Sequence, residues 1–308
     1  MRISLSLLVI LLFSSCKTSK INVAAVKNFA GATKDIATNT TAVYKNMWEL
    51  KYDIVQLSIA GVDSPAYLIE SLNENYNQKV ESEANATGYA SLYGILSSYA
   101  TLLMALTNED DLKNLRTEVG DLQCNMDSVI KKYNRFCPRP LSPSLGNFMS
   151  KIVFAAGDYR LKKMQKMFLK ESIDSGYDAI MEVCDNYSKL FAPRIKSDID
   201  MIPADISSAY TGFLETLRSA KNTTINHPFL YFSSYNPIYL DMVRRQKQIE
   251  LVYQQNEAAI ENIRKSFMRL KQAYVKKLTK KEWLDQNKNL IVSAHELKKA
   301  YEKLSIKK

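Results

Sequence analysis

Four cysteines and two histidines are the side chains in this chain most suited to nucleophilic or metal-dependent chemistry, but their spacing favours neither. Cys124, Cys137 and Cys184 are 13 and 47 residues apart, and no Cys/His pair joins them at the spacing of a zinc site. The sequence contains no H-E-x-x-H pair, no G-x-S-x-G turn and no glycine-rich phosphate loop. We therefore expect a protein that is not an enzyme and that holds no cofactor or metal. The enzymatic alternative is a lone glutamate acting on peptidoglycan as a general acid, and no residue is singled out for it.

The N-terminal segment has the features of an export signal. A positive start at residues 1–2 is followed by an apolar stretch at 3–13 and then by small residues. This pattern predicts a secretory signal that is too short to span a bilayer permanently. The stretch Phe13-Ser14-Ser15-Cys16 resembles the lipobox of bacterial lipoproteins, which implies cleavage before Cys16 and a diacylglycerol on its sulfur. The alternative is an ordinary secretory signal in which the cysteine is incidental.

The resemblance to lipoproteins implies an address for the chain. Residues 1–15 would be the removed signal peptide, and residues 16–26 a lipidated, polar tether. Several acyl chains would anchor Cys16 in the membrane permanently. No acidic residue stands beside Cys16, so the acidic inner-membrane retention signal of enterobacterial lipoproteins is missing. We therefore expect an outer-membrane lipoprotein that faces the periplasm, with the membrane as its first partner.

Three cysteines remain once Cys16 is lipidated. An exported compartment permits disulfides, and an odd number of thiols allows at most one internal bridge. The sequence favours a bridge between Cys124 and Cys137, because a helix end and a short loop can bring them together. The alternative is three free or mixed thiols, with Cys184 among them.

The scarcity of helix-breaking residues predicts the fold. Only 9 glycines and 8 prolines occur in 308 residues, and 46% of the residues are hydrophobic. This composition favours long helices over a β-sandwich or barrel and excludes general disorder. We predict an all-α bundle of long antiparallel helices with an elongated C-terminal helical hairpin. Residues 27–226 would form the bundle and residues 227–308 a basic hairpin packed on it, together making one continuous domain.

Capping residues followed by proline predict where helices begin. Ser64-Pro65 ends a first helix near residue 60 and opens a second that extends to about residue 106. Asn236-Pro237 opens the helix predicted to be the longest, and the capping box at 279–282 opens the last one. The helix after Pro237 carries an apolar stripe of Ile249, Val252, Ile260, Ile263, Phe267, Leu270, Tyr274 and Leu278.

Two further prolines predict interruptions. Pro193 and Pro203 should break the helical stretch around them. Asp198, Asp200 and Asp205 lie between or beside these prolines. We interpret them as residues of a solvated loop rather than as metal ligands.

Residues 84–108 carry no charge and are rich in leucine. Several serine, threonine and asparagine side chains in this segment would be costly in hydrocarbon. The pattern therefore favours the buried central helix of a soluble bundle. The alternatives are a membrane span and a segment that inserts into a bilayer conditionally.

The basic charge is concentrated at the C-terminal end. Residues 17–236 contain 24 Lys/Arg and 24 Asp/Glu, whereas residues 237–308 contain 17 and 8, an excess of nine. Lys265, Arg269 and Lys276 fall within about 40° of one another on the helix, opposite the apolar stripe. They predict a basic ridge that binds an acidic protein, an anionic lipid or lipopolysaccharide, but not nucleic acid. The alternative is a solvated helix face.

The segment that precedes this helix is rich in aromatic residues. Phe229, Tyr231, Phe232 and Tyr235 stand close together in it. Aromatic side chains on a loop are typical of binding hot spots. They could equally cap the end of the bundle.

The sequence as a whole predicts a lipid-anchored envelope protein that works by binding. Two roles fit equally, an accessory or scaffold subunit of an envelope complex and an immunity-type protein that neutralises a toxin. The alternatives are a membrane-active protein that inserts residues 84–108 and the peptidoglycan-acting enzyme.

Overall fold

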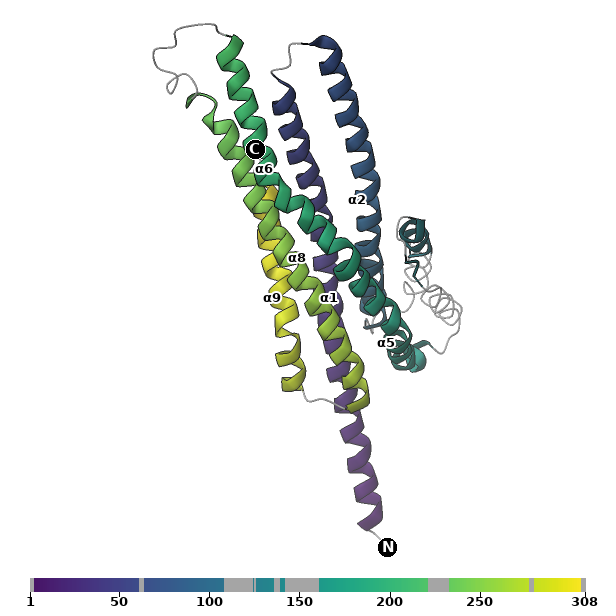
Figure 1. Ribbon diagram of the computed structural model, residues 1–308. Helices are drawn as coiled ribbons and strands as arrows, with labels where there is room; N and C mark the ends of the chain where they lie inside the picture. Colours follow the sequence, from purple (N-terminus) through teal and green to yellow (C-terminus); the bar gives the residue numbers. More distant parts are fainter. Residues whose placement is uncertain are drawn as a thin grey trace.

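Figure 1 shows the chain in a computed structural model as a bundle of long helices. The structure describes residues 3–60, 64–107, 124, 126–135, 139–141, 161–220, 233–276 and 280–305. All regular secondary structure in these residues is helical, so the predicted all-α class is confirmed. The elements are α1 (Ile3–Ile59), α2 (Pro65–Thr107), α5 (Leu161–Asn186), η1 (Tyr187–Phe191), α6 (Ala192–Ala220), α8 (Asn236–Lys276) and α9 (Lys280–Ser305).

Helices α1 and α2 form a long antiparallel pair, and α8 and α9 pack against α1 (Figure 1). Helix α1 has 57 residues and is longer than α8, which has 41, so the prediction that the helix from Asn236 is the longest was wrong. Helix α1 is longer than α8 because it begins at Ile3 and continues through the predicted signal and tether, residues 1–15 and 16–26. Cleavage and lipidation at Cys16 remain predictions, as does a domain division at residue 226.

The predicted helix starts agree with the structure. Helix α2 begins at Pro65, and the backbone N–H of Tyr67 donates to Ser64 Oγ at 3.5 Å. Ser64 therefore caps the helix, and proline occupies the first turn, where its missing N–H costs nothing. Helix α8 begins at Asn236, directly before a proline, and α9 begins at Lys280 inside the predicted capping box.

The predicted interruption at Pro193 and Pro203 was wrong, because α5, η1 and α6 follow one another without a break. In η1 the chain adopts a π-helix, and the N–H of Ala192 donates to the carbonyl of Tyr187, five residues earlier. This wider turn ends at Phe191, two residues before Pro193, whose ring would clash with the carbonyl four residues earlier in a regular α-helix. Pro203 lies inside α6. The aspartates predicted for a loop are therefore helical.

Aromatic rings from α1, α2, α5 and α8 meet in the core. The Phe267 ring stacks on Phe29 at a centroid distance of 5.4 Å and meets the Tyr99 ring edge-on at 5.6 Å. The predicted stripe on α8 is confirmed from Ile249 to Leu270, where each of its side chains is at most 1% exposed. Helix α5 approaches α2 closely at Gly176, where an added Cβ would lie 2.5 Å from the Tyr99 ring.

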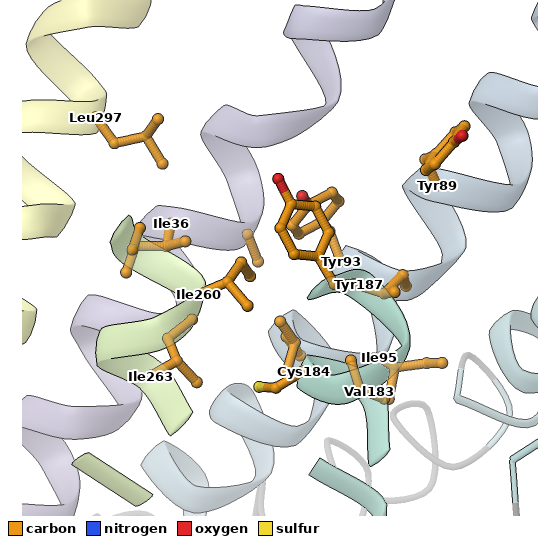
Figure 2. Packing of buried hydrophobic residues seen from close by; sticks show 14 of the residues in the cluster. Ile36, Tyr89, Tyr93, Ile95, Val183, Cys184, Tyr187, Ile260, Ile263 and Leu297 are labelled. Carbon is orange, nitrogen blue, oxygen red and sulfur yellow. The ribbon is translucent and has the colours of Figure 1, made fainter. Parts of the chain in front are cut away.

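A polar group of three side chains is enclosed in this core. Asn256 Nδ2 donates to Tyr93 Oη at 2.8 Å and to Tyr187 Oη at 2.9 Å. Figure 2 shows the two tyrosines next to each other and near Cys184. Burial raises the pKa of both tyrosine hydroxyls and raises the pKa of the Cys184 thiol from 9.0 to about 12. The two tyrosine hydroxyls and the Cys184 thiol are therefore neutral at physiological pH.

The uncharged segment 84–108 contributes to the same core. Its stretch Gly88–Thr107 is long and apolar enough to cross a bilayer, and 61% of it is buried inside the bundle. Leu92, Ile95, Leu96, Leu102 and Leu103 are fully buried. The segment thus has the position expected for a central bundle helix.

Candidate functional site

A cavity of about 800 Å³ lies between α1, α2 and α6. Its walls come from residues 45–58 of α1, from residues 75–86 of α2 and from Asp205 and Ser208 of α6. The first half of α2 is loosely packed, since Asn75 is the one buried side chain described between residues 66 and 80. The bundle is therefore open next to the C-terminal half of α1.

Two nitrogen donors in this wall have no acceptor. Trp48 Nε1 and Asn75 Nδ2 are both shut off from solvent, and neither makes a hydrogen bond within the part of the chain that the structure describes. Asn75 is only 5% exposed. A buried donor without an acceptor costs about 1–3 kcal/mol, because it loses its hydrogen bonds to water. Both residues line one cavity, so a ligand with acceptor atoms would satisfy these donors if the two side chains turned toward it.

Lysine side chains cover the aromatic rings of the wall. Lys51 Nζ lies 4.7 Å from the centroid of the Trp48 ring and donates to Asp198 Oδ1 at 2.7 Å. Lys79 Nζ lies 5.7 Å from the centroid of the Tyr52 ring. Tyr52 is 39% exposed, whereas the Lys51–Asp198 ion pair is mostly buried. The cation over Tyr52 is therefore the easier of the two to displace.

The charges around the cavity balance. The lining contains three lysines, at 45, 51 and 79, and three acids, at 49, 53 and 205. Asp53 also forms an ion pair with Arg245 of α8, whose side chain is 8% exposed. Together with Asp198, which pairs with Lys51, these groups sum to four cations and four anions. The charged groups around the cavity therefore sum to zero, and most of the accessible surface of its wall is apolar.

Sequence reasoning missed this cavity, for a physical reason. Trp48 and Asn75 are 27 residues apart on different helices, and no motif joins them. Asn75 itself gave no local signal, because Asn73 and Asn77 stand beside it on the same helix. Only its burial distinguishes it, and burial depends on how α1 and α2 pack.

The predicted basic ridge lies on α8, and at least one of its basic side chains is paired with an acidic residue. Lys265 forms an ion pair with Glu261 at 3.3 Å, one turn earlier on the helix. Arg269 is half-buried and engaged by neighbouring groups. Lys276 is the last residue of α8, and its side chain lies outside the described residues. Partner binding by the ridge remains a prediction.

The predicted aromatic hot spot is described only in part. Phe229, Tyr231 and Phe232 lie outside the described residues. The Tyr235 ring packs edge-on against Phe213 of α6 at a centroid distance of 5.3 Å. This contact is the one expected if the aromatic residues cap the end of the bundle.

The two described thiols are not among the residues that line the cavity. Cys124 is exposed and free, and Cys184 is buried and free. Cys137 lies outside the described residues, so the bridge between Cys124 and Cys137 stays a prediction. Within the described ranges, no three His, Cys, Asp or Glu side chains gather as metal ligands would. The described wall of the cavity carries groups that can hydrogen-bond and stack.

In comparisons with known proteins, no protein-family model, no curated protein and no solved structure matches the chain.

Proposed function

We propose that this chain is a lipid-anchored binding module of the bacterial cell envelope and that the cavity between α1, α2 and α6 is its binding site. The observation that supports the proposal is the pair of buried donors without acceptors, Trp48 Nε1 and Asn75 Nδ2. A ligand that supplies acceptors there would recover the free energy lost on burial of these groups. The stacking rings and the balanced charges suit binding without catalysis.

Trp48 provides a direct reporter of ligand binding. The chain contains two tryptophans, so Trp283→Phe leaves Trp48 as the single tryptophan. The mature protein in detergent would be titrated with fractions of a native envelope extract while Trp48 emission is recorded. We expect one class of fraction to change the emission in a saturable way. The matched control, Trp48→Phe with Trp283 retained, should stay silent, and silence of both proteins with every fraction would overturn the proposal.

The membrane anchor is tested separately. Cys16→Ala should leave the chain uncleaved by the lipoprotein signal peptidase and without acyl mass. Intact-mass spectrometry of the membrane fraction measures both changes at once. A mature mass that differs from wild type only by the substitution would show that Cys16 carries no lipid.

A partner protein is the second candidate, in either the accessory-subunit or the immunity-type role. It is favoured by an exposed apolar stripe on α2, defined by Ile69, Leu72, Tyr76 and Val80 at 59, 38, 64 and 49% exposure. These side chains fall within about 80° of one another, as in a helix that docks on another helix. A photo-crosslinking residue at position 76 should trap one discrete partner in cells, and the same residue at position 77 should not. Equal adducts at both positions would argue against the stripe.

Membrane insertion of residues 84–108 is the remaining alternative. It requires Leu102 and Leu103 to leave a fully buried environment. Leakage of liposomes caused by the wild-type protein and abolished by Leu103→Asp would favour this function over binding.

A further inference from the structure

We propose that the ligand of the cavity between α1, α2 and α6 is a saccharide. This proposal rests on the proposed binding function of that cavity. Its oxygen atoms would accept hydrogen bonds from Trp48 Nε1 and Asn75 Nδ2 once these side chains turn their donors into the cavity, because neither nitrogen is accessible without a ligand. One ring face would lie on Tyr52. Three properties of the wall support this class of ligand: its donors, its charge balance and its exposed aromatic ring.

The charge balance excludes ions as well-matched ligands. An anion would meet Lys45 and Lys79 but also the carboxylates at 49, 53 and 205. A cation would be attracted by these carboxylates but repelled by the lysines. A neutral ligand avoids both repulsions, and hydroxyl groups suit a mixed wall because each one both donates and accepts. Carboxylates can then accept from the ligand while lysine, amide and indole groups donate to it.

The aromatic wall requires an apolar surface on the same ligand. Tyr52 lines the cavity and is partly exposed, and the cation of Lys79 lies 5.7 Å from its ring centroid. A cation–π contact at an exposed site contributes about 0.5–1 kcal/mol, so moving the lysine aside costs little. A pyranose ring has C–H groups on one face and hydroxyls around its rim, which matches this combination of ring and donors.

The helical wall argues against an extended peptide, which is also neutral and rich in acceptors. Peptides that bind in extended form pair their backbone with an open strand edge. The cavity is lined by helices α1, α2 and α6, whose backbone groups already bond within each helix. The cavity volume, about 800 Å³, lies in the upper part of the usual range for ligand pockets of about 300–1,000 Å³. It therefore suits an oligosaccharide better than a single sugar.

The test uses Trp48 emission and calorimetry on the mature Trp283→Phe protein, in a detergent without a sugar head group. The probes are chitotetraose, maltotetraose and muramidase-solubilised peptidoglycan. We expect saturable binding of at least one probe. Chitotetraose or peptidoglycan alone would identify acetamido sugars of the cell wall as the source, and maltotetraose would identify a hydroxyl-only glucan.

Asn75→Leu separates recognition from stability. It removes the donor and fills its place with an apolar side chain, so affinity should fall roughly tenfold while the ligand-free protein keeps or gains stability. Asn77→Leu makes the same change at an exposed position of α2 and should leave affinity unchanged. Equal affinity of the two variants would overturn the saccharide contact at Asn75.

The failure of this inference differs from failure of the binding function. If envelope fractions change Trp48 emission and none of the saccharides does, the saccharide is refuted and the binding function stands. If neither envelope fractions nor saccharides change it, both proposals are refuted.

Discussion

Gly176→Ala tests how closely α5 and α2 pack. The new Cβ would lie 2.5, 2.7 and 2.8 Å from Cε2, Oη and Cζ of Tyr99. Ordinary contacts between such atoms are about 3.5–4.0 Å, so either the ring or the helix must move by about 1 Å. The ring has little room to move, because Tyr99 is 1% exposed, contacts Phe267, and donates from Oη to the Ser172 carbonyl at 3.0 Å.

The expected magnitude is a balance of three terms. Alanine in place of glycine within a helix stabilises by about 1 kcal/mol. Overpacking a filled core costs about 1–3 kcal/mol. Loss of the Tyr99–Ser172 hydrogen bond costs about 1 kcal/mol more. Gly176→Ala should therefore lower the free energy of unfolding by roughly 1–3 kcal/mol.

The assay is urea unfolding followed by far-ultraviolet circular dichroism. We expect the midpoint to fall while the slope with denaturant is kept. Gly212→Ala is the matched control, because Gly212 is exposed on α6 and an added Cβ there meets no atom within 4 Å. That variant should gain about 0.5–1 kcal/mol. If Gly176→Ala is as stabilising as Gly212→Ala, the close approach of α5 to Tyr99 is wrong.

Two further predictions concern buried groups. The pKa of the Cys184 thiol is raised by burial from 9.0 to about 12, so the unfolded chain loses this proton at lower pH than the folded chain. Stability contributed by this thiol should be complete below pH 9 and should disappear as the pH rises toward 12. In native protein at pH 8, with any bridge between Cys124 and Cys137 reduced beforehand, a thiol reagent should label Cys124 and leave Cys184 unmodified. Rapid labelling of both would contradict the burial. Asp53→Asn removes the carboxylate that faces the buried Arg245, so unfolding titrations should show a loss of about 1–3 kcal/mol, reduced because Asp53 is partly exposed. Asp200→Asn breaks an exposed ion pair and should cost less than about 1 kcal/mol, and equal losses in the two variants would refute the difference.

Local signals in the sequence predicted local structure well. The starts of α2 and α8 follow from a capping residue next to proline, because the missing N–H and the fixed φ of proline suit the first helical turn. The buried stripe of α8 follows from helical periodicity alone. Neither inference requires knowledge of the neighbouring helices.

Signals that depend on packing failed or were absent. Pro193 suggests a break, but η1 rearranges the hydrogen bonds before it and the helical run continues. The basic ridge was defined by Lys265, Arg269 and Lys276 alone, which left out Glu261, the ion-pair partner of Lys265 one turn earlier on the same helix. The partner of Lys51 is 147 residues away, at Asp198, where the sequence suggested a loop. Such pairs follow only from the arrangement of α1 against α6.

The continuous course of α1 has a mechanical consequence for a protein anchored at Cys16. From there to Trp48 the backbone is one unbroken helix of 32 further residues, roughly 50 Å long at 1.5 Å per residue. A flexible tether would let the bundle reorient freely above the bilayer, whereas a continuous helix is a rigid connection to the anchor. The binding cavity would then be held at a set height above the membrane surface, and its direction would be coupled to the lipid anchor. Ligand capture at this site would occur in a layer of the envelope well clear of the lipid head groups.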